Sequence, residues 1–120
     1  MDILERIRQR ATSRPQHIVL PEGNDPRTVV AAAQCANQRI ARITLLGDED
    51  VIRNAAHDNR VDLGGVEIIN HRRASDFEKM VSQLHDLRRA KGMMPDEART
   101  AVSDPLYYGN LMVRNGQADG

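Results

Sequence analysis

Three short apolar runs, separated by stretches with helical periodicity, most strongly constrain how this chain can fold. The runs lie at 17–20, 41–46 and 66–69, and Pro21 and Gly47 end the first two. They are rich in isoleucine, valine and leucine, which is typical of buried strands. Strands that alternate with helices favour a parallel sheet with right-handed crossovers. The fold class predicted is therefore α/β, a three-layer α/β/α arrangement around a mainly parallel sheet.

Capping residues indicate where the first helices begin. Asp25 followed by Pro26 is typical of a helix start, and Asp48 precedes a second helix. The helix after Asp25 is rich in alanine, and such small side chains allow a helix to lie close to a sheet. A short amphipathic leader helix is predicted at about 2–13, and the α/β core is predicted at about 17–120.

Three further helices are predicted after the third strand. Ser75 and Glu78 have the spacing of a capping box, in which the serine oxygen accepts from one free N–H and the glutamate from another. The clearest helical period of the chain follows: Phe77, Met80, Val81, Leu84 and Leu87. Gly92 is expected to end this helix in the left-handed conformation. Pro95 begins the next helix, and Asp104 caps the last one.

Charge and composition exclude several function classes. Lys+Arg and Asp+Glu both number 17, so the net charge is zero, and aromatic residues are only 2%. A nucleic-acid or membrane-surface partner is therefore not expected. Cys35 is the single cysteine, which excludes a disulfide framework. No apolar run approaches the roughly 20 residues that span a bilayer, and no signal core begins the chain, so a cytoplasmic location is expected.

Two loops at the expected carboxyl edge of the sheet are candidate ligand contacts. Open α/β sheets bind ligands where the loop 21–27 lies, directly after the first strand. However, Glu22 and Asp25 are acidic, which argues against a phosphate there, and a structural turn with a helix cap is the favoured interpretation. The pair Arg72 and Arg73 follows the third strand. It is a weak signal for an anion site, and a solvated surface pair is favoured.

The strongest single candidate for anion binding is Arg88, with Arg89 and Lys91 close by in the chain. Arginine matches the geometry of phosphate, so Arg88 could clamp a phosphate group. The spacing alone favours the simpler interpretation, in which the basic cluster complements the dipole at a helix end. The sequence alone leaves two roles open for Arg88, binding of a phosphate group and stabilisation of a helix end.

No metal site and no complete catalytic set are predicted. The four histidines are His17, His57, His71 and His85, and none has the spacing of a metal-ligand pair. Cys35 is expected to be a small packed side chain. The pair Ser103 and Asp104 is better explained by helix capping than by catalysis.

Taken together and in order, several segments resemble the N-terminal part of the phosphate acetyltransferase (phosphotransacetylase) family. They are IVLPEG at 18–23, LLG at 45–47, LRRAKG at 87–92, SDPLYYG at 103–109 and ADG at 118–120. The resemblance covers nearly the whole chain, so residues 1–120 are expected to be the N-terminal portion of such a transferase domain. Family members continue into further strands and a second domain, so the sheet is expected to be incomplete.

The resemblance implies an enzyme that reversibly transfers acetyl between coenzyme A and inorganic phosphate: acetyl-CoA + phosphate = acetyl phosphate + CoA. It implies no bound cofactor, with coenzyme A as substrate, and a homodimer for the full-length enzyme. Arg88 matches an arginine that the family places near CoA at an interdomain cleft. No catalytic residue can be assigned within 1–120, and this piece is expected to be inactive alone. The alternatives are a phosphate butyryltransferase, the phosphotransacetylase-like tail of a malic enzyme, or a non-catalytic ligand-binding module.

Overall fold

A computed structural model describes residues 2–120, and its centre is a three-stranded parallel sheet. The strands are β1 (Gln16–Leu20), β2 (Ala41–Leu46) and β3 (Val66–Ile69), in the order β1-β2-β3. Ile18 of β1 lies beside Ile43 of β2, which lies beside Val66 of β3. The predicted α/β class and parallel sheet are confirmed.

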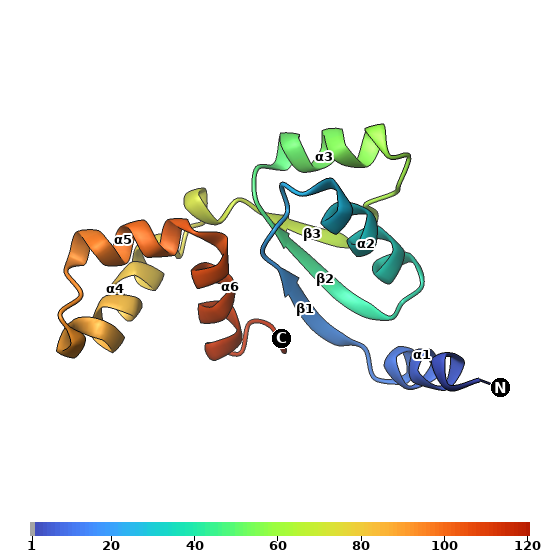
Figure 1. The fold of residues 1–120 in the computed structure, drawn as a ribbon, viewed down its shortest axis with the longest axis horizontal. Coiled ribbons are helices and arrows are strands. Elements are labelled where there is room, and N and C mark those ends of the chain that lie inside the picture. Colours follow the sequence, from blue (N-terminus) through green and yellow to red (C-terminus); the bar gives the residue numbers. More distant parts are fainter. Residues whose placement is uncertain (1) are drawn as a thin grey trace.

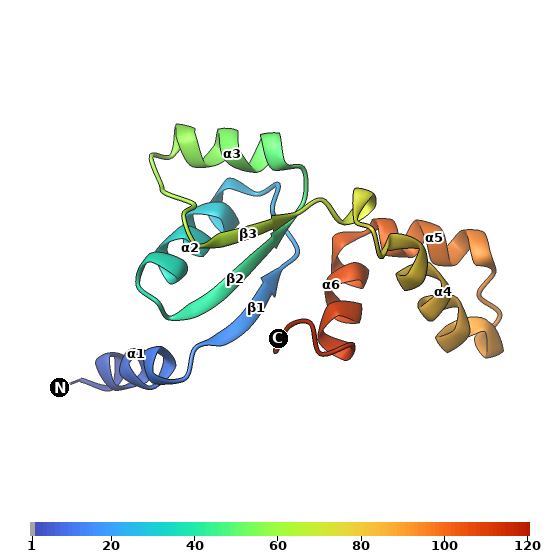
Figure 2. The same ribbon diagram turned by 180° about the vertical axis from the view of Figure 1, so that it is seen from behind.

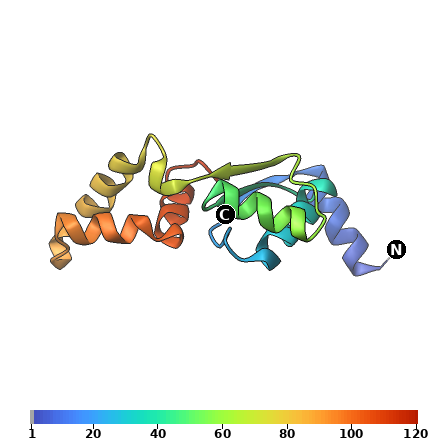
Figure 3. The same cartoon turned by 90° about the horizontal axis from the view of Figure 1, so that it is seen from above.

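Helices α2 (Pro26–Asn37) and α3 (Glu49–Asp58) cover one face of this sheet. Figure 3 shows both on the same side of the strands. The chain crosses from β1 to β2 to β3 in one direction, so two crossovers of the same hand place their helices on one face. The core beneath them contains Val29, Ala32, Ile43, Leu45, Ile52 and Ala56, all buried.

The predicted caps of these two helices are confirmed. The Asp25 carboxylate accepts from the backbone N–H of Arg27 at 2.9 Å. The Asp48 carboxylate accepts from the N–H groups of Asp50 and Val51 at 2.9 and 3.1 Å. Each cap satisfies donors that have no partner within the first turn of the helix.

A group of helices lies beyond the carboxyl ends of the strands, on the left in Figure 1 and on the right in Figure 2. It begins with a short 3-10 turn, His71–Arg73, and continues through α4 (Phe77–Arg88), α5 (Pro95–Ser103) and α6 (Pro105–Arg114). A second 3-10 turn follows α4 and ends at Gly92, which has the predicted left-handed conformation with φ 89°.

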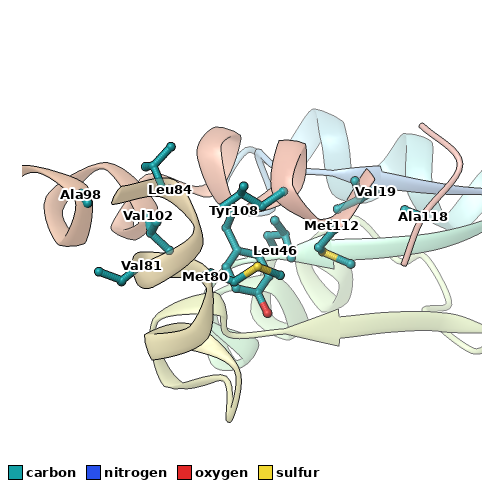
Figure 4. Close-up of a cluster of buried hydrophobic side chains, with 11 residues drawn as sticks. Val19, Leu46, Met80, Val81, Leu84, Ala98, Val102, Tyr108, Met112 and Ala118 are labelled. Atoms are coloured by element: carbon teal, nitrogen blue, oxygen red, sulfur yellow. The ribbon is translucent and has the colours of Figure 1, made fainter. Parts of the chain in front are cut away.

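These helices share a second core with the face of the sheet opposite α2 and α3. Figure 4 shows Val19 and Leu46 from the strands meeting Tyr108, Met112 and side chains of α4 and α5. Gly109 of α6 lies close to both strand residues, because a Cβ there would be 3.5 Å from Leu46 and 3.7 Å from Val19. These are ordinary packing distances, so α6 lies in direct contact with the sheet at this point.

Helix α1 (Ile3–Ser13) projects from the rest of the molecule (Figure 1), and none of its residues is buried. The Cα radius of gyration is 16.1 Å, against about 13–14 Å expected for a compact chain of this length. The extents of 52 × 31 × 20 Å fit an elongated molecule. None of the helices within residues 2–120 has the length and apolar character needed to cross a membrane.

The capping box predicted at Ser75 is wrong. Helix α4 begins at Phe77 after Asp76, and no side chain caps it. Glu78 instead accepts two hydrogen bonds from Arg99 of α5, at 2.5 and 2.6 Å. Asp76 accepts from the hydroxyl of Tyr108 at 2.5 Å. Of the two predicted capping residues, Glu78 therefore binds a partner on another helix and not the start of α4.

The last residues of the chain lie along the free edge of β1. The N–H of Asp119 donates to the carbonyl of His17 at 2.7 Å, and the carbonyl of Gly120 accepts from the N–H of Val19 at 2.8 Å. Successive residues of a strand direct their backbone N–H and C=O groups to opposite edges. Ile18 directs its groups toward β2, so His17 and Val19 direct theirs toward the free edge. Asp119 therefore lies along the edge of β1 that is not paired with β2.

Candidate functional site

A cavity of about 540 Å³ lies at the carboxyl edge of the sheet. Its lining comes from the three loops that follow the strands, 21–25, 46–48 and 70–72, and from Pro105 at the start of α6. Open α/β sheets bind ligands outside the carboxyl ends of their strands.

Two glycines link the three loops through backbone hydrogen bonds. The N–H of Gly23 donates to the carbonyl of Leu46 at 3.1 Å. A Cβ at Gly23 would lie 2.4 Å from that carbonyl oxygen, so no other residue fits without a shift of the backbone. Gly47 has φ +151° and donates to the carbonyl of Ile69 at 3.0 Å. The floor of the cavity is thus preformed by backbone contacts.

Asp25 and Asp48, the two aspartates of the lining, are already engaged as helix caps. Arg27 also donates to both oxygens of Asp25, at 3.2 and 2.8 Å, and these hydrogen bonds lower the pKa of the Asp25 carboxyl. Its negative charge persists at neutral pH beside the N-terminus of α2. A phosphate is therefore disfavoured on this turn, in agreement with the structural interpretation of 21–27.

His71 and Arg72 join the third loop to the end of α5. His71 is 4% exposed, and its Nε2 lies 2.7 Å from the carbonyl oxygen of Ser103, so this nitrogen carries the proton and donates. Arg72 donates to the same oxygen at 3.1 Å. Of the predicted basic pair, Arg72 lines the cavity and Arg73 does not. His71 is a packed residue, as the sequence suggested.

Arg88 lies elsewhere, in a groove of about 370 Å³ between α4 and α6. The groove is lined by Leu84, Leu87, Arg88, Tyr107, Asn110, Leu111 and Arg114. None of these side chains is acidic, so no carboxylate in the lining neutralises the two arginines. The structure thus places Arg88 apart from the carboxyl-edge cavity and together with Arg114.

Sequence reasoning did not find Arg114 or Asn110. The approach of α6 to α4 is a tertiary contact between segments about 25 residues apart, and no local pattern encodes it. The one available signal was the spacing of Asn110 and Arg114, which places both on one face of a helix. Arg89, adjacent to Arg88 in the sequence, does not line the groove.

The remaining candidates lie apart from both sites. His17 lies 2.7 Å from the hydroxyl of Thr44, which donates to Glu67 at 2.9 Å. Asp104 caps α6 through the N–H of Leu106 at 2.9 Å, which confirms its predicted role. Cys35 is half-buried beside the core under α2. Within residues 2–120 no three or more His, Cys, Asp or Glu side chains are grouped as metal ligands.

Comparisons with known proteins agree on one family. The family model described as phosphate acetyl/butaryl transferase matches residues 2–120. A phosphate acetyltransferase of Acetivibrio thermocellus is 42% identical over 120 residues, which is 100% of this chain and 36% of that protein. A phosphotransacetylase structure from Streptococcus pyogenes superposes with a TM-score of 0.88 at 30% identity, over 100% of this chain and 37% of that one.

A second solved structure, the EutD phosphotransacetylase from Staphylococcus aureus, has a TM-score of 0.82 at 26% identity and covers 96% of this chain and 34% of that one. The chain thus spans about a third of the length of the relatives that it matches. The family model spans nearly every residue, and the fold agrees. The chain belongs to the phosphate acetyl/butaryl transferase family.

Proposed function

We propose that the protein built on this chain transfers acetyl reversibly between coenzyme A and inorganic phosphate. The match of the family model to residues 2–120 carries the proposal. The relatives named phosphate acetyltransferase favour acetyl over butyryl as the transferred group. Because the chain spans 36% of such a relative, the proposed activity belongs to a full-length protein of that size.

The reaction makes three chemical demands: a base for the CoA thiol, cationic groups for phosphate, and stabilisation of the developing oxyanion. None of these demands is assigned to a residue of this chain, and Arg88, in the groove between α4 and α6, is instead the proposed contact for a phosphate group of CoA itself. We assign the base and the oxyanion donors to residues outside 2–120, since the described residues hold no positioned nucleophile and base at either site. The proposed role of this chain is therefore to bind substrate.

The proposal also covers the substrates, the cellular location, the oligomeric state and the partners of the enzyme. CoA or acetyl-CoA and phosphate or acetyl phosphate are the substrates, and no bound cofactor takes part. The full-length enzyme is proposed to be a cytoplasmic homodimer without a nucleic-acid or membrane partner. The balanced charge of 17 basic and 17 acidic residues supports the last point.

A chimeric enzyme tests the proposed function. Residues 1–120 replace the matching 36% of the Acetivibrio thermocellus enzyme, and thioester formation from acetyl phosphate and CoA is measured. We expect turnover by the chimera and none by residues 1–120 alone. The same enzyme without its N-terminal part is the control. A folded chimera that is inactive with acetyl phosphate contradicts the proposal, and faster turnover of butyryl phosphate makes the protein a butyryltransferase.

A further inference from the structure

We propose that a polar surface on the sheet, on the face opposite α2 and α3, is a docking surface for the first helix that follows Gly120 in the full-length protein. The polar surface consists of His17, Arg42, Thr44 and Glu67, and the docked helix brings a carboxylate to Arg42. This inference rests on the proposed function, in which the protein continues beyond residue 120, and adds an interaction surface to it.

The polar surface occupies the amino halves of the strands, where the sheet lacks a cover within residues 2–120. Successive side chains of a strand point to opposite faces, so His17 and Val19 lie on the same face. Val19 packs under α6 in the second core, as Figure 4 shows. By contrast, His17 is half-buried, and Arg42 and Glu67 are exposed. Parallel sheets are normally covered on both faces, so this half of the face requires a further segment.

Two hydrogen bonds hold the polar side chains in place across the three strands. The Nε2 of His17 lies 2.7 Å from the hydroxyl of Thr44, and that hydroxyl donates to Glu67 at 2.9 Å. A hydroxyl has one proton, so Thr44 accepts from His17 while it donates to Glu67. The Thr44 side chain is fully buried beneath its neighbours. The polar surface is thus preformed and gives the docked helix fixed polar groups to contact.

Arg42 is the charged group of the polar surface that has no partner within residues 2–120. The three carboxylates that line the same cavity, Glu67, Asp76 and Asp119, each accept a hydrogen bond already. No ion pair and no side-chain hydrogen bond of the described residues involves Arg42. Covering an unpaired guanidinium group costs free energy unless an anion pairs with it. The docked helix must therefore supply a carboxylate.

The hollow over the polar surface has the size and shape for a length of chain. A cavity of about 530 Å³ is lined by His17, Arg42 and Glu67, and by side chains of α6. A second cavity, of about 430 Å³, lies between the start of α4 and the end of α6. The two cavities share Asp76 and Gln117 in their linings. Together they form an elongated hollow, which suits a helix better than a compact small molecule.

The direction of the chain at Gly120 assigns the occupant. The residues from Gly116 to Asp119 form one wall of the cavity. Asp119 bonds to His17 and Gly120 to Val19, so the chain runs in the same direction as β1 along its free edge. A crossover from there to a further parallel strand moves away from β2, opposite to the crossovers that contain α2 and α3. With the same right-handed sense, its helix lies on the other face, over the polar surface.

Modification of histidines by diethyl pyrocarbonate, measured by mass spectrometry, tests whether the polar surface is covered. The reagent carbethoxylates accessible imidazole nitrogens, and the Nδ1 of His17 makes no hydrogen bond within residues 2–120. We expect His17 to be modified in the 120-residue chain and to lose most of that modification in the chimeric enzyme. The exposed His57 on α3 is the internal control and should react in both proteins. His71 is 4% exposed and should stay unmodified, which verifies the fold.

Substitution of Arg42 tests the carboxylate on the docked helix. Arg42→Ala in the chimera leaves that carboxylate unpaired, so modification of His17 should return, while the rate in the 120-residue chain should not change. Arg42→Lys keeps the charge and should keep most of the protection. Arg53→Ala is the matched control, because Arg53 lies on α3 and already pairs with Glu49.

Two outcomes overturn the docking surface. One is equal modification of His17 in the chain and in the chimera. The other is protection of His17 in the chain alone that increases with protein concentration, which would assign the surface to a second copy. An unchanged rate in the Arg42→Ala chimera overturns the carboxylate contact. Turnover by the chimera tests the proposed function separately, because modification of His17 does not require activity.

Discussion

Asp119 and His17 exchange two hydrogen bonds that hold the end of the chain against β1. The backbone N–H of Asp119 donates to the carbonyl of His17 at 2.7 Å, and the Asp119 carboxylate accepts from the N–H of His17 at 2.8 Å. The pair thereby holds the last residues against the edge of β1 that is not paired with β2.

The substitution Asp119→Ala should weaken this attachment. It removes the side-chain acceptor for the N–H of His17 and leaves the backbone bond in place. We expect the free energy of unfolding to fall by about 0.5–1.5 kcal/mol, the net contribution of one hydrogen bond. Urea unfolding monitored by circular dichroism measures the change. Asp119→Asn retains an acceptor oxygen and should retain most of the stability, and an equal loss in both variants would contradict the role given to the carboxylate.

A larger effect is expected for Gly23→Ala, because the new methyl group meets backbone. Its Cβ would lie 2.4 Å from the carbonyl oxygen of Leu46 and 2.9 Å from Ile52. Overpacking of this kind costs about 1–3 kcal/mol of stability. Gly64→Ala is the control, since a Cβ there meets only the carboxylate of Asp62, at 3.1 Å. Chemical unfolding measures the free energy of unfolding of both variants. Comparable values would show that the loop after β1 can shift to make room for the methyl group.

Local signals were sufficient to predict most elements of this fold. The strand before Pro21, the strand before Gly47, and the caps Asp25, Asp48 and Asp104 are confirmed because each depends on neighbouring residues alone. β-Branched residues favour strands, and an aspartate before the first turn satisfies its free N–H groups wherever the helix packs.

The rest depends on contacts between distant segments. The capping box at Ser75 fails because α4 begins at Phe77 after Asp76, and Glu78 is bound by Arg99, 21 residues further along the chain. Arg114 was missed because its position beside Arg88 follows from how α6 packs on α4. The pairing of Asp119 with His17 joins residues 102 positions apart. These pairings depend on how distant segments pack together in the fold. A sequence pattern that spans only a few residues carries no information about that packing.

The contact between Tyr108 and Asp76 predicts how stability depends on pH. Burial raises the pKa of the Tyr108 hydroxyl above its ordinary value of 10.0, and the hydrogen bond to Asp76 raises it further. Above about pH 10 the unfolded chain therefore loses this proton while the folded protein keeps it. The contribution to stability is fully present below pH 10 and decreases as the pH rises beyond that value.

Urea unfolding at several pH values between about 8 and 11 measures this dependence. The decrease above pH 10 should be smaller in Tyr108→Phe than in the wild type, because the substituted residue has no proton to lose. Tyr107→Phe is the matched control, since its neighbouring phenol takes no part in the contact with Asp76, and the variant should keep the wild-type decrease. Identical pH profiles for Tyr108→Phe and wild type would contradict the shift assigned to Tyr108.

The last prediction concerns Arg88 in the chimeric enzyme. If Arg88 binds a phosphate of CoA, Arg88→Ala removes a charge-assisted bond worth roughly 1.5–3 kcal/mol and raises the KM for CoA about tenfold to a hundredfold. The KM for acetyl phosphate should change much less. Arg88→Lys should restore part of the loss, because lysine keeps the charge but not the planar fork. Arg89→Ala is the control, since Arg89 lies in the 3-10 turn after α4 and does not line the groove. Equal effects of Arg88→Ala and Arg89→Ala on the KM for CoA, or none from either, would leave Arg88 as a helix-end charge only.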